Sequence, residues 1–159
     1  MSTAHVVTVS DGAFGGRRED RSGTHLVALL KSAGFEVDGP QLVPDDVERI
    51  TEAVMTAVAR GVDLVVATGG TGLGPRDVTP QAISALVDYE VEGIGEAMRR
   101  EGAKSTPMAV LSRSLGGVRG RTLIISVPGS PNGASESLQA VLPVVGHAIQ
   151  LLHGDTEHS

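Results

Sequence analysis

The sequence predicts an α/β fold of three layers, an αβα arrangement with a mostly parallel central sheet. Short β-branched runs alternate with segments of helical periodicity, as in sheets whose strands are joined by helical crossovers. Hydrophobic residues make up 40% of the chain but aromatic residues only 2%, so Val, Leu, Ile and Ala must build the core. That composition suits a parallel sheet covered by helices. The length of 159 residues suits a single domain over residues 1–159 with a polar tail at residues 155–159.

The first half of the chain predicts two strand–helix pairs. In each pair an extended run is followed by a loop, a polar residue can cap the next helix, and a glycine stops that helix. The strands are expected at residues 4–10 and 35–43, and the helices run from Ser22 to Gly34 and from Asp45 or Asp46 to Gly61.

The second half predicts two more strands and three helices. Residues 63–68 form a continuous apolar run of the kind found in the middle of a parallel sheet. The Thr79-Pro80 pair signals a helix start, because proline at the first helical position lacks an N–H that would have no partner there. A short helix is expected at residues 93–100, a strand at residues 122–127, and a last helix from Pro131 or Asn132 to near Leu152.

Composition excludes several classes of function. The formal charge is −6 and the pI is near 5.3, whereas general affinity for nucleic acid needs a basic surface. The chain has no cysteine, so disulfides, thiolate catalysis and Cys-ligated zinc are excluded, and the five histidines show no metal-ligand spacing. No charged-then-apolar leader opens the sequence, and no apolar run approaches the ~18 residues of a membrane span. We therefore expect a cytoplasmic protein that binds neither nucleic acid nor membrane.

A Gly-rich loop follows the predicted strand at residues 63–68 and indicates an anion site. Glycines let backbone amides approach a phosphate, and the helix that starts at Thr79 adds the positive end of its dipole. Pro75 stands where the dinucleotide fingerprint has its last glycine, and no Gly-Lys-Ser/Thr completes a Walker A loop. The alternatives are a mobile turn without a ligand, a local Arg76–Asp77 ion pair, and Thr79 as a simple helix cap. The candidate binding residues are Thr68, Gly69, Gly70, Thr71 and Gly72.

Asp77 in this loop needs a metal ion if it is to act beside phosphates. A carboxylate repels phosphate oxygens unless Mg²⁺ lies between them, and Mg²⁺ prefers one or two carboxylates together with the phosphates. From the residues alone, Asp45 and Asp46 are more simply helix caps.

Two further loops follow predicted strands. The segment at residues 126–133, SVPGSPNG, combines a strand end, a tight turn and a helix start; it could hold an anion or a purine edge, or serve only as a turn and cap. The segment at residues 8–11, TVSD, precedes a loop whose basic residues, Arg17, Arg18 and Arg21, could receive a second phosphate, or it could end in a simple turn beside solvated arginines. The candidates in these loops are Ser10, Asp11, Gly129, Ser130 and Asn132, and the candidate local positive charges are Arg17, Arg18, Arg76 and Arg113.

Taken in order, these loops resemble the molybdopterin-binding family of molybdenum cofactor biosynthesis, of the MogA/MoaB type. The resemblance covers residues 6–154 and rests on TVSD, DRSG, VPD, TGGTGLGPRDVTP, LSRS and SVPGSPN. It implies transfer of AMP from ATP to the terminal phosphate of molybdopterin, with Mg²⁺ as cofactor and release of pyrophosphate. It also implies a homotrimer and a downstream molybdenum-insertion enzyme that accepts the product.

The resemblance implies roles for individual residues as well. Asp77 and Asp45 match family positions linked to metal and nucleotide handling, and Ser112 of the LSRS segment matches a further functional position. The nucleotide and pterin pocket is expected to include the loop at residues 68–72 together with Gly129 and Asn132.

Three other functions remain open at this point. The chain could bind molybdopterin without turnover, although the presence of both Asp45 and Asp77 argues against that. It could be a nucleotide pyrophosphatase like the competence-damage proteins, which lack the TVSD start and the small size. A purely structural trimer would leave the Gly-rich loops unexplained.

Overall fold

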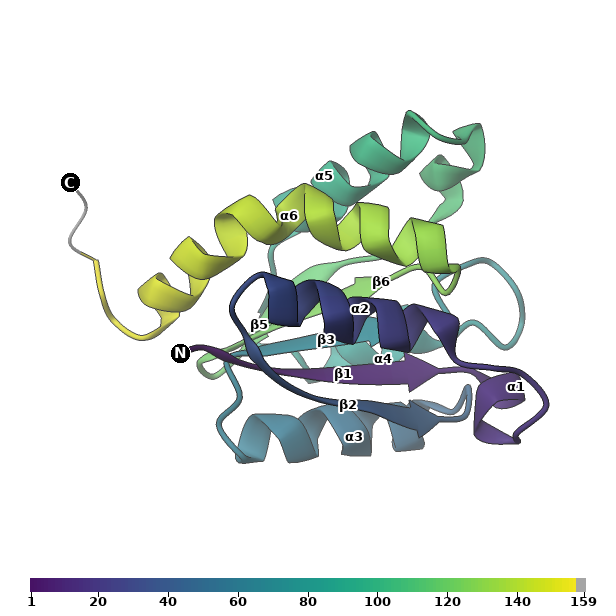
Figure 1. The fold of residues 1–159 in the computed structure, drawn as a ribbon, viewed down its shortest axis with the longest axis horizontal. Coiled ribbons are helices and arrows are strands. Elements are labelled where there is room, and N and C mark those ends of the chain that lie inside the picture. The colour runs from purple at the N-terminus through teal and green to yellow at the C-terminus, as the bar shows by residue number, and fades with distance from the viewer. Residues whose placement is uncertain (157–159) are drawn as a thin grey trace.

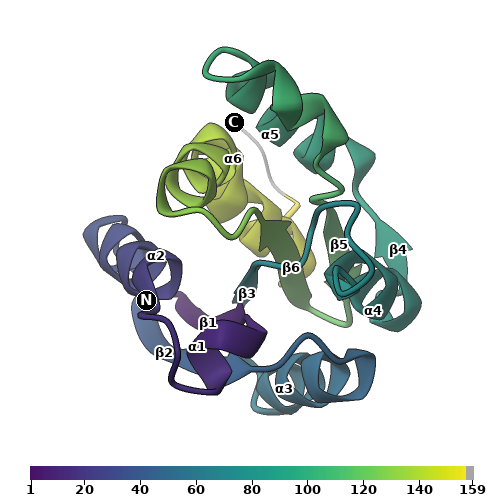
Figure 2. The ribbon, with the colours of Figure 1, turned by 90° about the vertical axis from the view of Figure 1, so that its right-hand side faces the viewer.

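The central sheet of the computed structural model, which describes residues 1–156, has six strands in the order β2-β1-β3-β6-β5-β4 (Figures 1 and 2). Strands β2, β1, β3 and β6 pair in parallel, whereas β5 is antiparallel to β6 and β4 is antiparallel to β5. The predicted mostly parallel sheet is confirmed. The strands are β1 (Thr3–Val9), β2 (Glu36–Val43), β3 (Leu64–Thr68), β4 (Tyr89–Glu90), β5 (Gly116–Arg119) and β6 (Thr122–Val127).

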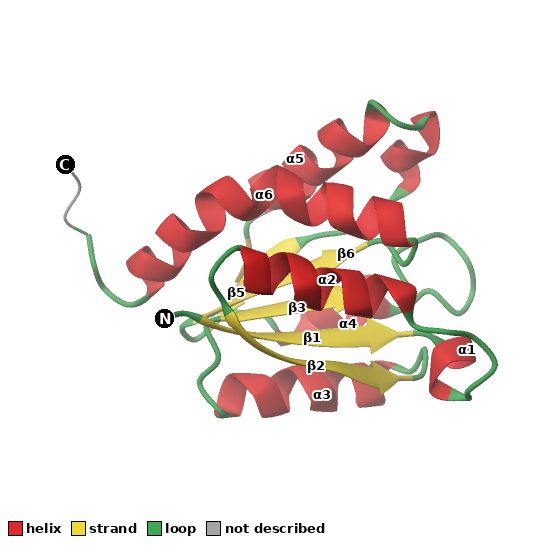
Figure 3. Cartoon of the chain, viewed as in Figure 1, coloured by secondary structure: helices red, strands yellow, loops and turns green. Residues whose placement is uncertain are grey.

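Helices cover both faces of this sheet and complete the three layers (Figures 2 and 3). Helices α2, α5 and α6 pack on one face, and α3 and α4 pack on the other. The helices are α1 (Asp11–Phe14), α2 (Arg21–Ser32), α3 (Val47–Ala59), α4 (Thr79–Leu86), α5 (Glu92–Ala103), the 3-10 helix η1 (Pro107–Leu111) and α6 (Pro131–Leu152). None of the helices in residues 1–156 combines the length and apolarity needed to cross a membrane.

Strand β3 shows why one continuous apolar run forms the centre of the sheet. It lies between β1 and β6, and all five of its residues are buried. Leu64 and Val66 face the core under α2 and α6, while Val65 and Ala67 face the core over α3 and α4. Because both faces are buried, neither set can be polar.

The helix caps differ in part from those predicted. Asp20, and not Ser22, caps α2, since its carboxylate accepts the N–H of Gly23 at 2.9 Å. Of the two acidic candidates for α3, Asp46 is the cap. The prediction that Thr79 caps α4 is wrong. Thr79 is the first residue of the helix, it is fully buried, and its hydroxyl has no hydrogen-bond partner among the described residues.

Strands β4 and β5 were not predicted, because a two-residue strand and a Gly-rich GGVR segment carry no alternating apolar pattern. Helix α1 also lies where only a loop was expected, with Ser10 as its cap. The final helix ends at Leu152 as predicted. Of the predicted polar tail, residues 157–159 lie outside the described residues, and the described part follows the end of α6.

A charged cluster joins the edge strand β2 to its surroundings. The Asp38 carboxylate contacts the buried His5 of β1 and accepts a hydrogen bond from Arg60 at 2.7 Å. Burial raises the pKa of Asp38, but the hydrogen bonds from Arg60 and His5 outweigh it and hold that pKa below its ordinary value.

Candidate functional site

Three loops meet where β1, β3 and β6 end. Because these strands are parallel, their carboxyl ends share one edge of the sheet, which is where ligands bind in folds of this kind. Thr68 at the end of β3 donates its hydroxyl to the carbonyl of Pro128 at 2.8 Å, and Gly69 donates its N–H to the carbonyl of Val127 at 3.1 Å. Gly129 lies so close to Gly69 that a β-carbon there would stand 3.2 Å from the Gly69 Cα. The predicted Gly-rich and SVPGSPN loops are therefore held together.

A polar cleft of about 610 Å³ opens between these loops. Four carboxylates and two guanidinium groups line it, so its own charge is acidic. Seven of the predicted site residues are in its lining, namely Ser10, Asp45, Thr68, Gly70, Asp77, Gly129 and Ser130. A triphosphate could enter such a cleft only with a cation to offset the carboxylates.

Asp11 and Asp45 join the loop after β1 to the loop after β2. The Asp45 carboxylate accepts the N–H of Asp11 at 2.9 Å, and the Asp11 carboxylate accepts the N–H of Asp45 at 3.0 Å. Asp11 also accepts two hydrogen bonds at 3.0 Å from Arg76. Asp11 is absent from the cleft lining, and its carboxylate is already engaged by these partners.

The two carboxyls differ in acidity. Burial raises the pKa of Asp45; the hydrogen bond from the Asp11 N–H works against this, but the charges of Asp11 and Asp77 raise the pKa further. The hydrogen bond from the Asp45 N–H, helped by Arg76, lowers the pKa of Asp11 despite some burial. Of the two carboxylates, the charged form of Asp45 is therefore the one that a nearby cation would stabilise more.

Asp77 closes the Gly-rich loop on itself. Its carboxylate accepts the N–H of Gly74 at 2.9 Å, and its own N–H donates to the Gly74 carbonyl at 3.0 Å. A β-carbon at either Gly72 or Gly74 would stand only 2.9 Å from the Asp77 carboxylate. The local Arg76–Asp77 ion pair that the sequence offered as an alternative does not form; Arg76 pairs with Asp11 instead.

Gly70 occupies a position that no side chain could share. Its φ is +67°, and a β-carbon there would overlap the hydroxyl of Thr79 and approach the Asp45 carboxylate to 3.2 Å. The N–H of Thr79 donates to the Gly70 carbonyl at 3.2 Å. The buried Thr79 thus packs against Gly70 and leaves no room for a side chain there.

The candidate positive charges are placed differently from one another. Arg18 lines the polar cleft, and Arg17 donates to the carbonyl of Asp11. Arg113 directs its guanidinium to backbone carbonyls of the Gly-rich loop. Of the predicted arginines, Arg18 and Arg21 therefore line the cleft where a phosphate could lie, whereas Arg17, Arg76 and Arg113 do not.

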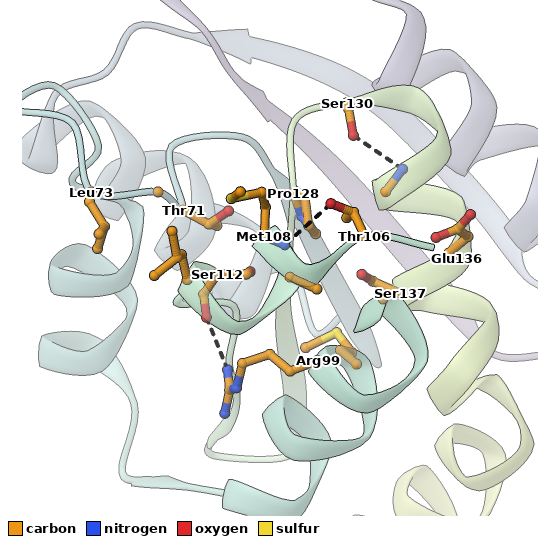
Figure 4. A pocket seen from close by; sticks show the side chains of 16 residues that line it. Thr71, Leu73, Arg99, Thr106, Met108, Ser112, Pro128, Ser130, Glu136 and Ser137 are labelled. Carbon is orange, nitrogen blue, oxygen red and sulfur yellow. Dashed lines mark hydrogen bonds between the residues drawn. The ribbon is translucent and has the colours of Figure 1, made fainter. Parts of the chain in front are cut away.

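A second cleft, of about 420 Å³ and largely apolar, lies on the other side of the Gly-rich loop (Figure 4). Met98, Met108 and Leu111 supply apolar walls from α5 and η1. Ser112 lines this cleft, and its hydroxyl donates to the Ser114 hydroxyl at 3.0 Å. Ser112 is thus separated from Asp45 and Asp77, which line the polar cleft.

Ser130 belongs to both clefts. It caps α6, where its hydroxyl accepts the N–H of Gly133 at 3.1 Å. The N-terminus of a 22-residue helix therefore points to the boundary between the clefts, and such an end favours anions. Thr71 and Gly72 line the apolar cleft, whereas Gly69 and the exposed Asn132 line neither.

Two parts of the site were not predicted from the sequence. Asp20 lines the polar cleft and accepts the hydroxyl of Thr8 at 2.8 Å, a role that the DRSG motif could have suggested. The apolar cleft has no sequence signal, since ordinary apolar residues of α5, η1 and α6 build it from distant segments. No group of three or more His, Asp or Glu residues that could hold a metal ion occurs in residues 1–156.

The fold and its surface define a three-layer α/β protein with two adjoining clefts at the carboxyl edge of its parallel strands. The family model described as "Probable molybdopterin binding domain" matches residues 5–147, and the chain belongs to this family. The expected family is thereby confirmed.

Individual relatives are similar over most of the chain. The crystal structure of a MoaB described as a molybdopterin biosynthesis enzyme, from Thermus thermophilus, has a TM-score of 0.90 and 48% identity, covering 97% of this chain and 98% of its own. Molybdenum cofactor biosynthesis protein B of Bacillus cereus is 40% identical over 93% of this chain and 89% of its own length. Molybdopterin adenylyltransferase of Helicobacter pylori is 36% identical over 98% and 91%. A gephyrin and two bifunctional molybdenum cofactor biosynthesis proteins are longer, and this chain spans only 23–48% of their length.

Proposed function

We propose that this protein is a molybdopterin adenylyltransferase of molybdenum cofactor biosynthesis, which transfers AMP from Mg-ATP to the terminal phosphate of molybdopterin. One observation carries the proposal: a polar and an apolar cleft meet at Ser130 and the Gly-rich loop. A reaction between two phosphorylated substrates needs two sites that share a boundary, so that the reacting phosphates can be held in line.

The polar cleft suits the triphosphate of ATP. Ser10 and Ser130 each keep a hydroxyl proton to donate in its lining, whereas the buried Thr68 already donates its own to the Pro128 carbonyl. Gly70 offers a closely approachable backbone. The apolar cleft suits the flat pterin ring, with Ser112 and Thr71 as polar contacts. The α-phosphate and the molybdopterin phosphate would then meet at the N-terminus of α6.

The donor set of the polar cleft fits Mg²⁺. Asp45 and Asp77 both line the cleft, and each leaves its Oδ1 without a hydrogen bond within residues 1–156. Mg²⁺ commonly takes one or two carboxylates and completes its ligands with phosphates and water, so a third acidic ligand is not needed. When bound, Mg²⁺ would supply neutralisation of phosphate charge.

The reaction needs no covalent intermediate on the protein. An oxygen of the molybdopterin phosphate attacks the α-phosphorus, the bond from that phosphorus to the β-bridging oxygen breaks, and pyrophosphate leaves. A phosphate monoester is largely a dianion at neutral pH and does not require a general base. The described linings of the two clefts accordingly contain no histidine.

The test is incubation of the protein with Mg-ATP and molybdopterin, followed by separation of the nucleotide products. Adenylyl-molybdopterin supports the proposal. Free AMP as the product would identify a nucleotide pyrophosphatase, and bound molybdopterin with unchanged ATP would identify a binding protein without turnover.

We also propose a homotrimer, by analogy with the family, a cytoplasmic location, and handover of the product to a molybdenum-insertion enzyme. Light scattering at micromolar concentration should give a mass three times that of the 16.3 kDa chain. A monomer under these conditions would remove the trimer from the proposal.

A further inference from the structure

Arg113 lies in the segment between η1 and β5, and its side chain contacts the Gly-rich loop. Its Nε and one terminal nitrogen donate to the carbonyl of Gly72 at 2.9 and 2.7 Å, and the same terminal nitrogen donates to the carbonyl of Asp77 at 2.8 Å. The other terminal nitrogen donates to the Gln81 side chain of α4 at 3.2 Å. One guanidinium therefore holds both ends of the turn formed by residues 72–77.

These bonds leave little of the Arg113 guanidinium for a substrate. Arginine has five N–H donors, and the described contacts already use four hydrogen bonds. Arg113 lines neither the polar nor the apolar cleft; it lies at a separate cleft beside α4, where Gln81 also lies. The expectation that it supplies positive charge to a phosphate therefore gives way to a different role.

The backbone of Arg113 extends the connection to the second cleft. Its N–H donates to the carbonyl of Thr71 at 2.9 Å, and the preceding residue, Ser112, faces the apolar cleft. Asp77, at the other end of the turn, faces the polar cleft. Arg113 is thus hydrogen-bonded to the turn that carries Asp77 and is adjacent in sequence to Ser112.

We infer that Arg113 is a positioning residue, which clamps the turn at residues 72–77 and so aligns Asp77 with Ser112. The inference rests on the proposed function for its effect on turnover, whereas the clamp itself is a property of the free protein. The planar fork of arginine can reach two carbonyls at once, and the single ammonium of lysine cannot reproduce that geometry. Charge alone should therefore not replace Arg113.

The test compares Arg113→Lys with Arg119→Lys. Arg119 is a matched control, because it also donates to a backbone carbonyl, that of Leu86, but lies outside both clefts. In Arg113→Lys we expect faster amide hydrogen exchange at residues 72–77 and a kcat lower by about tenfold to a hundredfold, the scale of a small misplacement of reacting groups. More Mg²⁺ should be needed for half-maximal binding of ATP, and the KM for molybdopterin should change little. Arg119→Lys should match the parent.

A second variant separates positioning from folding. Arg113→Ala should regain part of its rate when guanidinium ion is added at low concentration, and ammonium ion should not restore it. Unchanged hydrogen exchange at residues 72–77 in Arg113→Lys, or a kcat within about twofold of the parent, would overturn the inference. Loss of ATP binding in Arg113→Ala with and without Mg²⁺ would instead make Arg113 a phosphate ligand. If the parent protein itself transfers no adenylyl group, the proposed function fails, while the exchange and ATP-binding measurements still decide on the clamp.

Discussion

Asp77→Asn removes one negative charge from the polar cleft and changes little else. The Asp77 carboxylate accepts the N–H of Gly74 at 2.9 Å, and the amide oxygen of asparagine can accept the same hydrogen bond. The turn should therefore keep its shape. Under the proposed function, the substitution removes a charged ligand for Mg²⁺ next to the phosphates of ATP.

The expected effects on rate and on stability point in different directions. Loss of a preorganised electrostatic group at a reacting phosphate costs roughly 3–4 kcal/mol, so the rate should fall at least a few hundred-fold. The hydrogen bond to Gly74 weakens by about 1 kcal/mol at most, while the repulsion that raises the pKa of Asp45 is relieved. The melting temperature should stay within about 4 °C of the parent.

The measurement is adenylyl transfer at saturating Mg-ATP together with a thermal melt. Asp88→Asn is the control, since Asp88 accepts the N–H of Gly120 at 2.8 Å in the same manner but lines neither cleft. The control should keep the full rate. An Asp77→Asn variant that melts like the parent and keeps more than about a tenth of its rate would refute the metal-ligand role.

Three further changes test other parts of the account. Gly70→Ala should destabilise the protein by clearly more than the ~1 kcal/mol expected for Gly120→Ala in denaturant unfolding, because both positions have positive φ but only Gly70 lacks room for a β-carbon; equal losses would remove the steric argument. Ser112→Ala should slow turnover by ~1.5–3 kcal/mol of transition-state stabilisation with little change in melting temperature, and an unchanged rate at saturating substrates would make Ser112 an ordinary surface residue. Asp38→Asn should cost up to about 1 kcal/mol at neutral pH, since Asp38 has a lowered pKa and its ion pair with Arg60 is partly exposed. Because that stabilisation is present above the ordinary carboxyl pKa and is lost as the pH falls through the lowered pKa of Asp38 in the folded protein, the gap between the melts of parent and variant should begin to narrow below about pH 4 and should close once the pH is below that lowered pKa; a gap that does not narrow on acidification below pH 4 would contradict the assignment.

The sequence predicted the parallel part of the sheet well, because the pattern and the packing agree there. Residues 63–68 are apolar without interruption, and β3 is buried on both faces. By contrast, β5 and β4 owe their strand state to pairing beside β6, a contact between distant segments that a local pattern cannot show. The sequence predicted Ser22 as the cap of α2, and Asp20 takes that role instead; its carboxylate also accepts the hydroxyl of Thr8, a contact with β1 that the local pattern does not show.

The sequence predicted which loops form the site, but not which side chains connect those loops. Glycines, hydroxyls and carboxylates after strand ends indicated the polar cleft, because parallel strands bring their carboxyl ends together. Two of the connections join residues that are far apart in the chain: the ion pair of Arg76 with Asp11, and the hydrogen bonds from Arg113 to the Gly-rich loop. Their side-chain types were visible in the sequence, but their partners depend on how the loops fold back.

The central claim is that two substrates react across the boundary at Ser130, and the release of pyrophosphate tests it most directly. The protein is incubated with Mg-ATP, first without and then with molybdopterin, and pyrophosphate is measured against adenylyl-molybdopterin. The account predicts that pyrophosphate appears only when molybdopterin is present, in equal amount to the adenylylated product. Pyrophosphate released at the same rate without molybdopterin, or no pyrophosphate in either case, would contradict it.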